Sequence, residues 1–311
     1  MSKFRFSFFF HNFALIWKGI GDCTTFLKEK SLCATIMEKP YTIEKAKTSL
    51  CEILIEFASF CEEHNLCYFL AYGTLLGAVR HQGFIPWDDD IDVMMPEKDY
   101  LKLKELYHSK RFSLHTCYDD PTILLPMGRM YDNNTYGIDG RRHTLGLSID
   151  IYLMFGSPVT ETEVDVHINN IRKYTNIGLG FKKWGNGLYH RYLLPERNFL
   201  LQMSKHYNKK RLEEYQKYPF EEGDYVFITT DSRRYKRSYF EGREKKMFEG
   251  REFYVPAGWH ECLTVRYHDY MKLPPEEDRK IRHLSTMFYD KVPAYSEIEE
   301  RGYVQLATSQ G

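Results

Sequence analysis

The sequence lacks the features typical of membrane-spanning and nucleic-acid-binding proteins. None of its 311 residues belongs to an uncharged apolar run of the roughly 18 residues that a membrane-spanning helix needs. Lys and Arg number 43, and Asp and Glu number 43, so the formal net charge is zero. The basic excess of a general nucleic-acid binder is therefore missing. We expect no nucleic-acid partner and no helix that crosses a membrane.

Cysteine is scarce, and its arrangement argues against two common uses. The seven cysteines are odd in number, irregularly spaced and never paired as Cys-x-x-Cys. Zinc ribbons and disulfide scaffolds are therefore poor interpretations. Free thiols are typical of a reducing compartment, so we expect a cytoplasmic protein.

Aromatic residues are abundant, with 24 Tyr and 21 Phe. Tyrosine suits ligand clefts and interfaces, because its ring is apolar and its hydroxyl polar. The length corresponds to about two domains, or to one large domain. We expect an N-terminal segment over 1–40, a catalytic core over 41–160 and a mostly helical part over 161–311 that completes the substrate cleft.

The N-terminal segment has an unusual composition. Its first 21 residues contain three Lys or Arg, no acidic residue and many aromatic residues. No small residues of the Ala-x-Ala kind follow, so a secretory signal is poorly supported. Two interpretations stay open. Residues 1–21 contact a membrane surface, such as the inner face of the cell membrane, or they form a helix that packs on the domain.

Short-range patterns predict a mixed α+β fold with a helical C-terminal half, and no regular βαβ alternation. Residues 160–217 are predicted to be helical, with an interruption at 178–187. The other predicted helices are 42–65, 75–81, 98–107 and 258–271, and the predicted strands are 66–72, 91–95, 112–117, 125–131 and 145–155, with short strands over 225–256.

A cluster of aspartates provides the strongest chemical signal. Asp88, Asp89, Asp90 and Asp92 lie within five positions. Residues two apart on a strand share a face, at a spacing of about 6.6–6.8 Å. Asp90 and Asp92 should therefore face together with Asp88, while Asp89 points elsewhere. Such carboxylates repel unless a cation lies between them, and oxygen ligands suit Mg²⁺ or Mn²⁺.

Asp150 is the second acidic signal, because it stands alone in an apolar strand. A buried aspartate is costly unless it is paired or bound to a metal. If its strand pairs with the strand of Asp92, three carboxylates converge. This favours a metal site over a solvated acidic run. A calcium loop fits less well, because Val93 replaces its glycine and Asp99 its final glutamate.

Gly73 and Thr74 follow a predicted strand and precede a short helix. Glycine lets backbone N–H groups approach a phosphate, and a helix N-terminus favours an anion. The order of strand, Gly-Thr, short helix and Asp-x-Asp strand resembles the signature of the nucleotidyltransferase fold of polymerase-β-like enzymes. Metal held by the acids would neutralise phosphates during an in-line displacement.

Three segments together resemble a known family. GTLLGAVRHQGFIPWDDDIDV, GLSIDIYLM and VPAGWHECLTVRYHDYMKLPPEEDR resemble the LicD family of phosphotransferases, which are related to fukutin and fukutin-related protein. The resemblance covers roughly 45–285. One departure is His268, where glycine is common in the family.

The resemblance implies a nucleotidyltransferase fold: a mixed sheet flanked by helices, with helical C-terminal additions. It also implies Mg²⁺ (or Mn²⁺) held by Asp88, Asp90, Asp92 and Asp150, with the last three catalytic. Gly73 and Thr74 would form the phosphate-binding turn. Further candidates for binding substrate or phosphate are Arg80, His81, Trp87, Arg129 and Lys236. A quaternary ammonium group favours aromatic faces, and the candidate walls are Tyr72, Trp87, Tyr131, Tyr152 and Trp184.

The reaction implied by the resemblance is transfer of phosphocholine from CDP-choline to a sugar hydroxyl of a bacterial surface glycan, with release of CMP. The acceptor, free or lipid-linked, would be a precursor of teichoic acid, lipopolysaccharide or capsule. Transfer of ribitol phosphate or another alditol phosphate from a CDP-linked donor is an alternative, as is transfer of a nucleotidyl group. A non-enzymatic, acidic metal-binding module is the remaining alternative.

Overall fold

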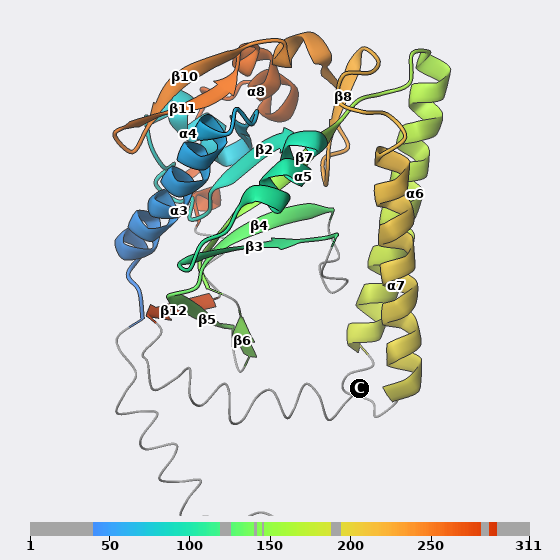
Figure 1. Ribbon diagram of the computed structural model, residues 1–311, viewed down its shortest axis with the longest axis horizontal. Helices are drawn as coiled ribbons and strands as arrows, with labels where there is room; N and C mark the ends of the chain where they lie inside the picture. Colours follow the sequence, from blue (N-terminus) through green and yellow to red (C-terminus); the bar gives the residue numbers. More distant parts are fainter. Residues whose placement is uncertain are drawn as a thin grey trace, which may run out of the picture. The chain divides into compact units, whose positions relative to one another are not determined.

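A mixed sheet carries the core of the protein in a computed structural model (Figure 1). The structure describes residues 40–118, 126–139, 142–144, 146–187, 194–280 and 286–290. Residues Tyr41–Phe288 form one compact unit. The predicted membrane-surface segment, 1–21, lies outside the described residues.

Seven described strands form this main sheet, in the order β1-β2-β7-β4-β3, with β8 paired to β7 and β9 paired to β8. The pair β2–β7 is parallel and the other pairs are antiparallel. The strands are β1 (Phe69–Leu70), β2 (Asp92–Pro96), β3 (Phe112–Thr116), β4 (Met127–Asp132), β7 (Ser148–Phe155), β8 (Tyr225–Ile228) and β9 (Tyr235–Lys236). The predicted α+β class is confirmed.

Helices pack on this sheet through apolar faces. In α3 (Ile43–Glu63), residues such as Leu50, Leu54 and Phe57 recur at helical spacing and are buried. Thr42 begins this helix, because its hydroxyl accepts a hydrogen bond from the Lys45 N–H at 3.2 Å. The other helices are α4 (Tyr72–Arg80), α5 (Glu97–Leu106), α6 (Glu161–Gly187), α7 (Leu194–Tyr215) and α8 (Trp259–Tyr267), with the short 3-10 helices η2 (Arg237–Phe240) and η3 (Glu276–Asp278).

Two smaller sheets complete the fold. A hairpin of β10 (Arg243–Phe248) and β11 (Arg251–Pro256) packs near β1 and α4. The other sheet contains β5 (Thr135–Asp139), β6 (Arg142–Thr144) and β12 (Thr286–Asp290). The strands over 225–256 were predicted, whereas β5 and β6 were not.

Three predicted elements differ from the observed ones. The predicted strand 66–72 is only two residues long, because Tyr72 has a φ of +43° and turns the chain directly into α4. The predicted helix 258–271 ends at Tyr267, because His268 takes a φ of +59°. The predicted interruption at 178–187 is wrong. Helix α6 continues to Gly187, and Gly178 lies against α7, where its carbonyl accepts a hydrogen bond from the Ser204 hydroxyl at 2.8 Å.

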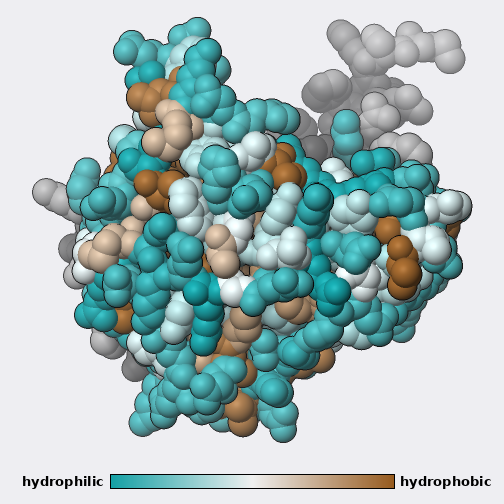
Figure 2. Space-filling view, turned by 90° about the horizontal axis from the view of Figure 1, so that it is seen from above, coloured by the Kyte–Doolittle hydropathy of each residue, from teal (hydrophilic) through white to brown (hydrophobic). Residues whose placement is uncertain are grey.

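The described residues also bear on the membrane and cysteine expectations. Among the described helices, none is both long enough and apolar enough to span a membrane. Figure 2 shows a mostly hydrophilic face on which hydrophobic side chains are scattered. The described cysteines are all free, and these are Cys51, Cys61, Cys67, Cys117 and Cys262.

Candidate active site

The two acidic strands lie side by side, as predicted. Asp92, the first residue of β2, is directly opposite Asp150 of β7 in the parallel pairing. The Asp150 N–H donates to the Ile91 carbonyl at 3.0 Å, which fixes this register. Because adjacent strands are about 4.8 Å apart, the two carboxylates start from neighbouring backbone positions.

Asp92 is buried, with only 8% of its surface exposed. Burial, together with the nearby carboxylates of Asp90 and Asp150, raises the pKa of Asp92 well above its usual range. The negative charge of Asp92 is therefore poorly compensated within the protein. A cation in the adjoining cavity would stabilise it.

Thr74 supports the acidic strand rather than the cavity. This residue is buried, and its hydroxyl accepts a hydrogen bond from the Asp92 N–H at 2.8 Å. The Asp92 carbonyl in turn accepts the Ala71 N–H at 3.0 Å. These two hydrogen bonds fasten the beginning of α4 to the beginning of β2. Sequence reasoning placed Thr74 on a phosphate-binding turn, but Thr74 lies in the first turn of α4 and does not line the cavity.

Gly73 does line the cavity, and its lack of a side chain is required there. A Cβ atom at this position would lie 2.4 Å from Asp88 Oδ2. Asp88 and Asp90 precede β2 instead of belonging to it, because the strand begins at Asp92. All three acids nevertheless line the same cavity.

Arg129 binds Asp150 and does not line the cavity. It lies opposite Asp150 in the pairing of β4 with β7. Its Nε is 2.7 Å from Asp150 Oδ1, and its Nη2 donates to Oδ2 at 3.2 Å. This two-point contact orients the carboxylate and balances its charge. The prediction that Arg129 binds phosphate is therefore not supported by its position.

The cavity beside these acids has a volume of about 680 Å³, enough for a small-molecule substrate. Of the predicted residues, Arg80 and Trp87 line it, whereas His81 and Lys236 do not. His81 lies at the end of α4, where its Nδ1 is 3.4 Å from the Arg80 Nε. The remaining lining residues come mostly from the C-terminal part of the chain: Thr230, Asp231, Arg266, Tyr267, Asp269, Tyr270, Lys272, Leu273, Pro274, Pro275 and Lys280.

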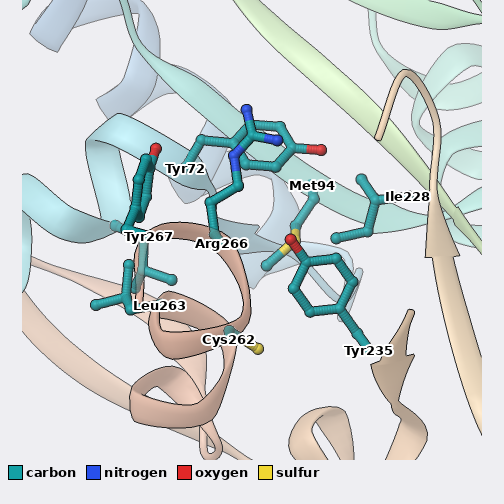
Figure 3. Close-up of a pocket in the computed structure, with 9 residues that line it drawn as sticks. Tyr72, Met94, Ile228, Tyr235, Cys262, Leu263, Arg266 and Tyr267 are labelled. Atoms are coloured by element: carbon teal, nitrogen blue, oxygen red, sulfur yellow. The ribbon is translucent and has the colours of Figure 1, made fainter. Parts of the chain in front are cut away.

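Arg266 is the main site residue that sequence reasoning missed. Its Nη1 donates to Asp231 Oδ2 at 3.2 Å, and its guanidinium lies 4.6 Å from the centre of the Tyr72 ring. Figure 3 shows this side chain rising from α8 over that ring. Asp231 also accepts the Tyr235 hydroxyl at 2.8 Å. No local pattern signals this cluster, because its members are brought together only by the fold.

A small apolar pocket lies beside Arg266 (Figure 3). Its volume is about 20 Å³, space for roughly one water molecule. Met94, Ile228 and Leu263 contribute to its wall. It is too small for a substrate group, unlike the 680 Å³ cavity.

Two of the aromatic rings predicted to contact choline already have an arginine guanidinium against them. Arg266 covers Tyr72, and Arg279 lies 5.4 Å from the centre of the Trp87 ring. Tyr152 lines the cavity and contacts Tyr72 edge to face, with ring centres 4.9 Å apart. Tyr131 does not line it, and the side chain of Trp184 lies outside the described residues. The cavity wall is thus richer in cations near the rings than the sequence indicated.

Comparison with known proteins identifies relatives of this chain. A family model described as "LicD/FKTN/FKRP, nucleotidyltransferase domain" matches residues 65–176, which include all four acids. The lipopolysaccharide cholinephosphotransferase LicD of Haemophilus influenzae is 32% identical over 269 residues, covering 80% of this chain and 99% of the relative.

The chain belongs to the LicD family. Two uncharacterised proteins, from Rickettsia prowazekii and Rickettsia typhi, are each 39% identical over 69 residues, or 22% of this chain. The matched segment covers 26% and 22% of their own lengths, respectively. The Haemophilus influenzae relative, which matches over 99% of its length, is named as a transferase, and this LicD-family chain is accordingly an enzyme.

Proposed function

We propose that this LicD-family enzyme transfers phosphocholine from CDP-choline to a sugar hydroxyl of lipopolysaccharide or a related surface glycan. The similarity to the named cholinephosphotransferase, over 99% of its length, carries this proposal. Asp92, which lines a substrate-sized cavity and lies opposite Asp150 in the sheet, supports it. The described cysteines are free, which supports a cytoplasmic location.

One or two of the cavity-lining acids Asp88, Asp90 and Asp92 would hold Mg²⁺ at this site. Among the described residues, no three carboxylate, imidazole or thiol groups converge into a ready-made metal cage. The acidic side chains that line the cavity still suit Mg²⁺, because this ion takes one or two protein carboxylates and completes its coordination shell with substrate phosphates and water. When bound, the ion would neutralise the phosphate charge of the donor.

The chemistry is a single displacement at phosphorus. The acceptor oxygen bonds to the phosphorus that carries choline, the bond from that phosphorus to the CMP oxygen breaks, CMP leaves, and the proton of the acceptor hydroxyl passes to a carboxylate or to water. Arg80 and Arg266 line the cavity and supply positive charge for the phosphates. Asp150 does not line this cavity, but its side chain is 23% exposed and Arg129 orients it, so its carboxylate could accept a hydrogen bond from an acceptor hydroxyl at the edge of the site.

Transfer of an alditol phosphate is the second candidate, and a specific observation favours it. Because Arg266 and Arg279 lie against Tyr72 and Trp87, these ring faces are less open to a trimethylammonium group. Hydroxyl-rich groups such as ribitol would instead use polar partners. We also propose that the main sheet has the nucleotidyltransferase fold. The order of β1, α4 and the acidic strand β2 along the chain supports this assignment.

A donor competition tests the proposal. The purified full chain is incubated with a glycan acceptor and equal amounts of CDP-choline, CDP-ribitol and CDP-glycerol, and transferred groups are measured by mass spectrometry. A ring contact worth roughly 0.5–2 kcal/mol corresponds to a preference of about twofold to thirtyfold for choline. Faster transfer from CDP-ribitol would reject phosphocholine in favour of the second candidate. If Trp87→Ala lowers the transfer rate equally for all three donors, Trp87 packs against the site and does not contact choline.

A further inference from the structure

Two stretches of the α6–α7 hairpin, 166–183 and 199–212, carry charge of one sign in a chain whose net charge is zero, and together we call them its distal half. Glu196, in the first turn of α7, lies outside them. No Asp or Glu occurs in 166–183 or in 199–212. The same two stretches contain the basic residues Arg172, Lys173, Lys182, Lys183, Lys205, Lys209, Lys210 and Arg211. All but the buried Arg211 are at least partly exposed. Solvated helix faces usually mix both signs, so this arrangement is unusual.

Apart from Glu196 in the first turn of α7, the acidic residues of the two helices lie at the base of the hairpin, and most of these have basic partners. Arg234 pairs with Glu161 and Asp165, and Lys217 pairs with Glu214 at 2.8 Å. In the described part of the chain, Lys209 is the one exposed cation of the distal half with an ion pair, at 3.8 Å from Glu213. The other cations are therefore available to an external anion.

Exposed apolar side chains lie among these cations. Leu179 is 45% exposed and Phe199 is 61% exposed. On α6, the spacing of Arg172, Leu179 and Lys183 places them on one face, which is exposed along its length. A helix surface that combines lysine with exposed leucine and phenylalanine suits the interface of an anionic bilayer better than a purely polar polyanion.

We propose that the distal half of the α6–α7 hairpin docks on an anionic lipid bilayer. The proposal does not depend on the transfer reaction, because none of these residues lines the 680 Å³ cavity. Each Lys or Arg held near such a surface strengthens binding by about fivefold. The attraction should weaken in high salt, because ions screen exposed charges.

Vesicle sedimentation of the full chain tests this surface. The probes are vesicles of phosphatidylglycerol with phosphatidylcholine, and vesicles of phosphatidylcholine alone. We expect binding to the anionic vesicles only. The variant Lys182→Gln/Lys183→Gln/Lys205→Gln/Lys209→Gln should bind at least about a hundredfold more weakly. The control Lys102→Gln/Lys104→Gln/Lys245→Gln/Lys246→Gln loses the same charge from α5 and β10, and it should bind like the native protein.

Comparison of the two variants distinguishes a hairpin surface from an effect of net charge. Equal weakening in both variants would show that only net charge matters, and would overturn the proposal. Unchanged binding in the hairpin variant would also overturn it and would assign any membrane contact to another segment, such as 1–21. Binding to soluble heparin but not to vesicles would replace the bilayer with a soluble polyanion. CMP release from the soluble donor should be unchanged in both variants, and unfolding curves would verify that both are folded.

Discussion

Thr74 provides a direct test of how the acidic strand is held. Thr74→Val keeps the shape of the side chain but removes the hydroxyl that accepts the Asp92 N–H at 2.8 Å. The buried N–H would then lack its partner, at a cost of about 1–3 kcal/mol. For a chain of this size, each kcal/mol lowers Tm by about 2–4 °C. Thr74→Ser keeps the hydroxyl and is the matched control.

The same pair of variants distinguishes support of Asp92 from phosphate binding. If Thr74 supports the strand, Thr74→Val should lower both Tm and kcat, the latter by about tenfold to a hundredfold because a misplaced acid loses its alignment. Thermal unfolding and steady-state CMP release measure these effects. A raised KM for the donor with an unchanged Tm would refute the support role and would indicate that Thr74 binds the donor phosphate. Equal behaviour of Thr74→Val and Thr74→Ser would refute both roles of the hydroxyl.

Three further predictions follow from single residues. Asp92→Asn should slow transfer by about a thousandfold or more. It should also raise the free energy of unfolding by about 1 kcal/mol, because two charges about 5 Å apart repel by roughly 3 kcal/mol and Arg129 offsets part of this repulsion. A less stable variant that retains its activity would contradict this prediction. His268→Gly should raise Tm by about 2 °C, because glycine adopts a positive φ without the strain of about 1–2 kcal/mol that histidine bears; an unchanged or lower Tm would argue against strain. Burial lowers the pKa of His167, so the imidazole binds a proton more readily in the unfolded chain than in the folded one. The free energy of unfolding measured in urea should therefore fall as the pH drops below about 6.5. His167→Gln should reduce this pH dependence, and an identical pH profile in the variant would show that His167 does not cause it.

The acidic centre could be predicted because local pattern and strand geometry both bear on it. The alternation of Ile149, Asp150 and Ile151 indicated a strand with one acid on its polar face. The observed register confirms that this strand pairs with the strand of Asp92. The expected convergence of three carboxylates is not found among the described residues. Sequence periodicity is informative here because the side-chain alternation of a strand is fixed.

The rest of the site depends on tertiary contacts that periodicity does not encode. Arg266 reaches Tyr72 and Asp231 from positions far apart in the chain. Thr74 was assigned to phosphate because its neighbour Gly73 suggested a turn, but the positive φ of Tyr72 begins the helix earlier and turns the Thr74 hydroxyl toward β2. The predicted break in α6 failed for a similar reason, since Gly178 serves packing against α7.

The proposed transfer of phosphocholine by this LicD-family enzyme depends on the acids of β2 and β7. The most direct measurement incubates choline-labelled CDP-choline, Mg²⁺ and purified lipopolysaccharide with the native chain or with Asp92→Asn, and follows label in the glycan and CMP in solution. We expect equal amounts of labelled glycan and CMP with the native chain and neither product with Asp92→Asn. Labelled glycan from Asp92→Asn at the native rate would contradict the account, as would CMP release without label in the glycan.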